Sequence, residues 1–202
     1  RQRQMCIRDS SKLTYPQKFS GSNREVKLSG QAFFNVSPDK SHPFIVKTKK
    51  MDVTVMGTSF EIFSYDNDKE VEAVLLTGKV KVAISDNKKL EGKIYTLAPN
   101  EKLTYSEEKG VNLTNIDADA YSGWRKGKRM SFKNETLQMI LNRLEKWYGQ
   151  RIECDPQLAE YYRFTFTVHS EPLALILNYI SHSAPLTYKM VGNNHYLIEL
   201  KH

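Results

Sequence analysis

Residues 24–36 read REVKLSGQAFFNV, and this stretch decides the fold of the first half of the chain. From Val26 to Val36, every second position is apolar or glycine, and the positions between them are polar except for Phe33. A period of two is typical of a β-strand that buries one face and exposes the other. The stretch therefore predicts a long strand lying on a hydrophobic core.

The same alternation continues to about residue 116. Apolar residues recur at every second position in five further runs, at 44–46, 51–55, 60–62, 71–75 and 80–84. Short clusters of Pro, Asp, Asn and Gly separate the runs and indicate turns. Many short strands with no helical stretch between them predict an all-β domain, either a sandwich or a solenoid-like stack.

The period changes after residue 121. Two apolar stripes follow at helical spacing, the first at Leu137, Ile140, Leu141, Leu144 and Tyr148 and the second at Leu173, Ile176, Leu177 and Ile180. We predict that Asn134 caps the first helix and that Gly149 ends it. Ser170 and Pro172 precede the second helix, which must stop before Pro185.

The two helical segments are copies of one another. Residues 132–144 correspond to residues 168–180 at a constant offset of 36. Each copy reads strand, helix, strand, with strands expected at 129–132, 151–154, 164–168 and 187–190 and a final strand at 196–200. Two units are too few for a repeat array. We therefore predict a compact βαβ-βαβ domain, which makes the whole chain α+β.

The opening segment 1–10, RQRQMCIRDS, shows neither period and joins the following residues abruptly. We interpret it as a cloning or sequence-assembly scar. The expected organisation is then an all-β domain over 11–118, a hinge over 119–128 and the βαβ-repeat domain over 129–202.

Composition and charge bound the class of protein. The chain is 40% hydrophobic and 11% aromatic, which is enough for a packed core, and no apolar run approaches the roughly 20 residues of a membrane helix. Its net charge of +7 is concentrated in residues 1–10 and in the basic cluster 125–129. Nucleic-acid binders usually spread basic groups over a broad face, so we do not expect a nucleic-acid partner.

No motif for catalysis, cofactor binding or metal binding stands out. The sequence contains no Walker or Gly-x-Gly-x-x-Gly pattern, no Gly-x-Ser-x-Gly elbow and no metal-like histidine spacing. We interpret the carboxylate pairs Glu70 with Glu72 and Glu107 with Glu108 as solvated, and Cys154 as a small core residue. We therefore expect no catalytic, cofactor or metal site.

Seven residues are candidates for contact with a partner protein: Trp124, Arg125, Lys128, Arg129, Tyr161, Tyr162 and Arg163. We expect Trp124 to dock into a domain interface, because a large apolar ring rarely stays exposed. The basic cluster either attracts an acidic partner or is a solvated linker. Tyr161 and Tyr162 lie in the connection between the repeats, and open sheet edges in such a domain suit recognition by strand addition.

Five motifs in order give the first half a family resemblance: residues 30–36 (GQAFFNV), 43–46 (PFIV), 55–60 (VMGTSF), 75–80 (LLTGKV) and 97–101 (LAPNE). They resemble the core of the FecR domain, with Gln31 in place of the commoner Glu and Met56 in place of the commoner Leu. The stripe from Trp124 to Tyr148 resembles the C-terminal domain that accompanies FecR in Bacteroidetes regulators. That domain is similar to the short N-terminal domain of secretins and TonB-dependent receptors.

The resemblance implies a non-enzymatic signal relay in the periplasm. In this family an outer-membrane TonB-dependent receptor is read through its N-terminal signalling domain, and the signal passes to an extracytoplasmic-function sigma factor. The family's sigma-binding segment and its inner-membrane helix would lie upstream of residue 1, so we expect sigma to be bound only through that segment. Two alternatives are a carbohydrate-active or other hydrolytic enzyme on a β scaffold and a secretion-associated structural domain.

Overall fold

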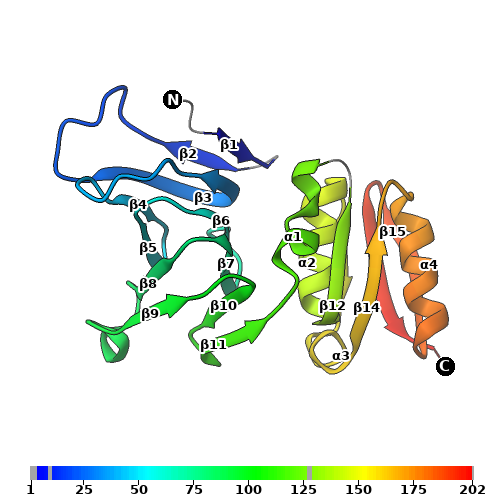
Figure 1. Cartoon of the computed structure of the whole chain (residues 1–202). Coiled ribbons are helices and arrows are strands. Elements are labelled where there is room, and N and C mark those ends of the chain that lie inside the picture. Colours follow the sequence, from blue (N-terminus) through cyan, green and yellow to red (C-terminus); the bar gives the residue numbers. More distant parts are fainter. Residues whose placement is uncertain (1–3, 9–10, 127–128, 202) are drawn as a thin grey trace. The chain divides into compact units, whose positions relative to one another are not determined.

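The structure is a computed structural model that describes residues 4–8, 11–126 and 129–201. The chain divides into two compact units, residues 1–125 and residues 126–202, and each is described here by itself. Figure 1 labels most of their strands and helices. Within the described residues, no helix is long and apolar enough to cross a bilayer.

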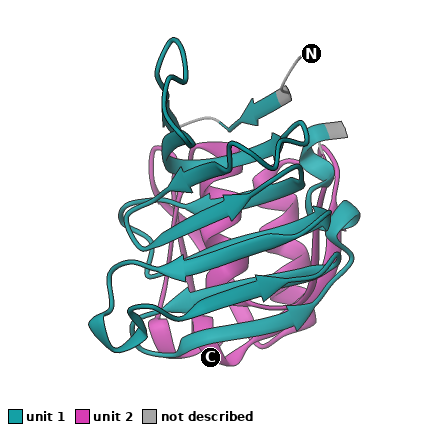
Figure 2. Ribbon diagram, turned by 60° about the vertical axis from the view of Figure 1, so that its left-hand side comes forward, with its two compact units in different colours: residues 1–125 teal, residues 126–202 magenta. Residues whose placement is uncertain are grey.

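The first unit is dominated by one curled sheet (Figure 2, teal). Its strands are β1 (Gln4–Ile7), β2 (Lys12–Thr14), β3 (Arg24–Asn35), β4 (Phe44–Lys47), β5 (Met51–Val55), β6 (Ser59–Ser64), β7 (Glu70–Thr77), β8 (Val80–Ile84), β9 (Ile94–Leu97), β10 (Glu101–Ser106) and β11 (Gly110–Asn115). Short helical turns follow at η1 (Lys88–Leu90), α1 (Ala118–Tyr121) and η2 (Gly123–Lys126). The prediction of a β-rich first half is confirmed.

Strand β3 organises the sheet because it belongs to both of its arms. Residues 24–27 pair with β4, residues 30–35 pair with β6, and the sheet then runs outward in the orders β4-β5-β8-β9 and β6-β7-β10-β11. The change of partner falls near Gly30, whose φ is +121°. A Cβ there would lie 2.4 Å from Ser11 Oγ, so the close approach of the chain at this point favours glycine.

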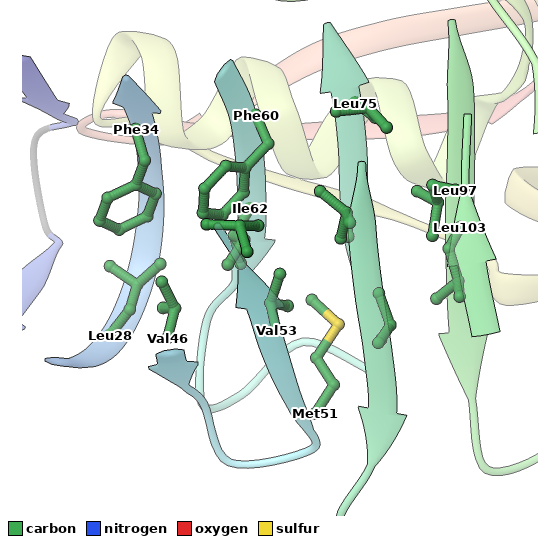
Figure 3. Close-up of a cluster of buried hydrophobic side chains, with 14 of the residues drawn as sticks. Leu28, Phe34, Val46, Met51, Val53, Phe60, Ile62, Leu75, Leu97 and Leu103 are labelled. Atoms are coloured by element: carbon green, nitrogen blue, oxygen red, sulfur yellow. The ribbon is translucent and has the colours of Figure 1, made fainter. Parts of the chain in front are cut away.

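The core lies between the two arms. Phe34, Phe60 and Leu75 from one arm meet Val46 and Val53 from the other (Figure 3). These are the inward positions of the period-two alternation, and their burial is the main favourable term for folding this unit. The sequence pattern therefore identified the inner face correctly.

Residues 4–7 differ from the expectation of an irregular tail. They form β1, which pairs antiparallel with β3 from Gln4 opposite Asn35 to Ile7 opposite Ala32. Strand pairing needs only backbone hydrogen bonds, so a stretch without a period can still join an open edge. That residues 1–10 are a scar stays a prediction.

The second unit contains strands β12 (Met130–Thr136), β13 (Arg151–Cys154), β14 (Arg163–Val168), β15 (Leu186–Gly192) and β16 (His195–Leu200), and helices α2 (Leu137–Tyr148), α3 (Pro156–Tyr161) and α4 (Leu173–Ser183). The two predicted helices are α2 and α4, and Gly149 ends α2 in the left-handed conformation, with φ +64°. Helix α3 is an addition that the sequence pattern did not indicate.

The strand pairing of the second unit differs from a simple βαβ arrangement. Strand β12 pairs antiparallel with β14, whereas β13, β16 and β15 form a separate sheet in that order. The two strands that flank each helix therefore enter different sheets. One core joins both sheets to α2 and α4, and it includes Phe132, Ile140, Ile176 and Ile198.

The first helix begins two residues later than predicted. Its N-cap is Thr136, whose side chain accepts a hydrogen bond from the Met139 amide, and not Asn134. Asn134 instead sits in an irregularity of β12 with φ +52°, and its amide donates to Thr165 Oγ1 at 2.9 Å. Asparagine tolerates the left-handed region, so it suits a bulge as well as a cap.

Candidate interaction site

The structure distributes the seven predicted contact residues over both units. Trp124 and Arg125 lie on η2 in the first unit, and Arg129 is exposed just before β12 in the second. Lys128 lies outside the described residues. Tyr161, Tyr162 and Arg163 are consecutive at the junction of α3 and β14, so the structure brings these three together.

Trp124 is held within the first unit by a buried carboxylate. The exposed fraction of Glu61 is only 2%, and its carboxylate accepts hydrogen bonds from three groups. Gln31 Nε2 and Trp124 Nε1 each donate to Oε1 at 2.5 Å, and Ser122 Oγ donates to Oε2. Losing any of these bonds would leave a buried polar group without its partner, which is costly. The indole is therefore fixed on the sheet of the first unit.

A second buried carboxylate holds the neighbouring helical turn. Glu72 accepts a hydrogen bond from Tyr121 OH and forms an ion pair with Lys102, whose Nζ lies 3.2 Å from Oε1. Both members of that pair are nearly inaccessible to solvent. The interpretation of Glu72 as a solvated carboxylate is therefore wrong, whereas Glu107 and Glu108 are exposed.

Arg125 covers the outer face of the same sheet. Its guanidinium carbon lies 3.9 Å from the centroid of the Phe33 ring, and its Nε donates to the Ser122 carbonyl at 3.1 Å. Phe33 is the one apolar residue among the polar positions of the alternation. Its side chain is only 5% exposed because Arg125 lies over its ring. We name residues 118–125 together with Glu61 and Glu72 the clasp.

Residues 119–125 of the clasp lie within the segment 119–128 that was predicted as a hinge. They form α1 and η2 and pack on the sheet of the first unit. The cause is the pair of buried carboxylates, which would be costly to bury without donors. Both carboxylates bind donors of the chain itself, so they fix residues 118–125 on the sheet.

The junction of α3 and β14 presents a solvent-facing tyrosine. Tyr161 is 78% exposed, and its ring packs edge-on against Tyr162 with centroids 5.1 Å apart. Arg163 Nη1 donates to the carbonyl of Asn134 at 2.6 Å and so supports the bulge of β12. An exposed aromatic ring beside a fixed guanidinium is a common composition for a protein contact.

A groove that the sequence pattern does not indicate runs between β14 and α4. Its volume is about 570 Å³, and its walls come from β14 and from one face of α4. Phe164, Phe166, Ile176 and Ile180 supply apolar surface, and Tyr179 on the α4 side is 58% exposed. The only sequence signal was the alternation in β14, which indicates an apolar face but not that the face borders an open groove.

Cys154 and Glu171 of the second unit have shifted pKa values. Burial, followed by the nearby Asp155 carboxylate, raises the pKa of the Cys154 thiol to about 11, so it is protonated at neutral pH. Hydrogen bonds from backbone amides, first that of His169 at 2.7 Å, lower the pKa of Glu171 at the end of the groove. No group of three His, Cys, Asp or Glu side chains suited to a metal occurs in the described ranges.

Two protein families match the chain, one on each unit. The family described as FecR protein matches residues 3–81, and the family described as FecR, C-terminal matches residues 129–198. No curated protein matches the chain significantly.

Two solved structures are similar over nearly the whole length. Both are of a protein assigned as an anti-sigma factor from Parabacteroides distasonis. One is 26% identical with a TM-score of 0.83, covering 98% of this chain and 95% of that one. The other is 27% identical with a TM-score of 0.84, covering 97% and 89%. With both family domains in order and this likeness across both units, the chain belongs to the FecR-like anti-sigma factor family.

Proposed function

We propose that this chain is the periplasmic sensing portion of a transmembrane anti-sigma regulator. In this proposal the second unit binds the N-terminal signalling domain of an outer-membrane TonB-dependent receptor. The signal then passes to an extracytoplasmic-function sigma factor through an inner-membrane helix and a sigma-binding segment upstream of residue 1. The chain acts by protein–protein binding and catalyses no reaction.

The observation that carries the proposal is the match of residues 129–198 to the FecR C-terminal family directly after a FecR unit. The second unit has its own core, so it can present a surface without support from the first. Its exposed Tyr161 beside Arg163 offers an aromatic and a cationic group for recognition. The burial of the two clasp carboxylates argues against the hydrolytic alternative, because neither Glu61 nor Glu72 is open to a substrate.

The direct test is the affinity of the whole chain for the purified N-terminal signalling domain of a TonB-dependent receptor from the same organism. Isothermal titration calorimetry should detect a one-to-one complex. Tyr161→Ala should raise Kd about tenfold, because exposed aromatic anchors often contribute more than 1 kcal/mol to binding. Tyr15→Ala is the matched control, since Tyr15 is an exposed tyrosine of the first unit. Absence of any complex with the unaltered chain would refute the proposed function.

A further inference from the structure

The second unit contains four strands with an unpaired edge. Within residues 129–201, β12 and β14 form a two-stranded sheet, and β13 and β15 flank β16 in the other sheet. Each of these four strands therefore lacks a strand neighbour on one side among the described residues. An open edge offers backbone N–H and C=O groups to an incoming strand.

Three of the four edges carry features that discourage pairing. Strand β12 has a register shift between Phe132 and Glu135, and β15 has one between Met190 and Gly192. Strand β13 has only four residues, and its Arg151 carries a charge. Bulges, charges and short length are the usual means by which proteins protect open edges.

Strand β14 has none of these features after its first residue. Its residues 164–168 read FTFTV, without charge, glycine or proline. Thr165 and Thr167 contact β12 on the outer face, where Thr167 Oγ1 lies 2.9 Å from Ser131 Oγ. A regular strand of six residues spans about 20 Å, which is enough to pair with a second strand of ordinary length.

The groove between β14 and α4 borders this strand. Its apolar surface comes from Phe164 and Phe166, and Tyr179 projects from α4 with 58% of its surface exposed. A strand added to β14 would place alternate side chains toward these groups. The groove volume of about 570 Å³ lies within the range of protein ligand-binding sites.

The charges at the two ends of the groove are opposite. Arg163 begins β14, and Glu171 lies three residues beyond its end, and both line the groove. An added strand is therefore favoured when it has an acidic residue near Arg163 and a basic residue near Glu171. These two charges define which end residues the added strand carries, and also the direction in which it runs along β14.

We infer that β14 is the docking edge for the receptor, and that an extended segment of its signalling domain binds there as an added strand. The segment alternates apolar residues, which face Phe166 and Tyr179, with polar ones, and it carries opposite charges at its ends. This inference rests on the proposed function, because it names the surface that the same receptor domain uses.

Amide hydrogen exchange read by NMR on the whole chain tests the inference. On addition of the purified receptor signalling domain, unpaired amides within 163–168 should exchange at least tenfold more slowly. The edge of β15, residues 186–192, is the internal control and should be unchanged. A complex that forms without slowing exchange in β14 overturns the inference and leaves the proposed function standing. If no complex forms, the proposed function fails and this inference falls with it.

A pair of substitutions gives an independent readout. Tyr179→Ala removes the exposed wall of the groove and should raise Kd for the receptor domain about tenfold or more. Met190→Ala, which removes a side chain of similar exposure from the edge of β15, should leave Kd unchanged. Equal effects of the two substitutions, or an effect of Met190→Ala alone, would contradict docking at β14.

Discussion

At the scale of single residues, the outward positions of the first sheet depart most from what their pattern indicates. Glu61, Glu72 and Phe33 all lie on the side that the alternation marks as polar or solvated, yet each is at most 5% exposed. They are buried because residues 118–125 cover them, about 50 to 90 positions later in the chain. Local alternation describes one strand and contains no information about what lies over its outer face.

Glu61→Gln should destabilise the first unit by about 2 to 3 kcal/mol. The substitution turns one acceptor oxygen into an NH₂ group, although three donors point at the carboxylate, so at least one buried donor loses its partner. Urea unfolding followed by Trp124 fluorescence in a Trp147→Phe background measures the loss. Glu25→Gln, which breaks a half-exposed pair with Lys47, is the control and should cost less than about 1 kcal/mol. Equal losses in the two variants would show that the hydrogen bonds to the Glu61 carboxylate do not stabilise the first unit.

Cys154 should react slowly with iodoacetamide. Because the thiolate is the reactive form, a thiol with a pKa of about 11 is about a hundredfold less ionised at pH 8 than an ordinary one. In a Cys6→Ser variant, mass spectrometry should show alkylation that is slow at pH 8 and still accelerates above pH 9. A rate that levels off near pH 9 would mean that burial does not raise this pKa.

At the scale of elements, the positions of helices α2 and α4 were predicted well, but the pairing of the strands that flank them was not. The offset of 36 places both helices correctly, since the N-caps Thr136 and Pro172 are themselves 36 residues apart. Asn134 was the wrong cap because serine, threonine and asparagine compete for the same role and only the backbone conformation decides between them. Strand pairing between β12 and β14 joins the two repeats, and no local pattern indicates such a pairing.

Thr136→Ala should cost about 1 kcal/mol of stability in the second unit, because the Thr136 hydroxyl accepts from the Met139 amide at 3.3 Å. Thr136→Ser keeps the hydroxyl and should retain most of the stability. Chemical denaturation followed by far-UV circular dichroism compares the two. Equal losses would assign the effect to the lost methyl group and not to the cap.

At the scale of the whole molecule, the chain has two separate principal cores. One lies between the arms of the curled sheet, and the other joins α2 and α4 to the two small sheets. The chain divides into two bodies with different architectures, residues 1–125 and residues 126–202. The boundary lies after Arg125, because the clasp ties residues 118–125 to the first of them.

Core substitutions should act within their own unit. Ile140 and Ile62 are both fully buried, one in each core, and truncation to alanine should cost about 2 to 5 kcal/mol. In amide exchange, Ile140→Ala should accelerate exchange in α2 and β16 and leave β6 and β7 unchanged, and Ile62→Ala should do the reverse. Acceleration in both units from either substitution would show that the two cores unfold together.

The sequence by itself determined the main strands of the first half, the positions of helices α2 and α4 and where they end, and the change from a period of two to helical spacing after residue 121. These properties follow from local periodicity, turn residues and an internal repeat, all of which act over a few to a few tens of residues. Only the tertiary structure decided that β14 pairs with β12, that Glu61 and Glu72 are buried, and that a groove opens beside β14. The physical reason is that strand pairing and the covering of an outer face depend on groups far apart in the chain, whose meeting no local pattern encodes.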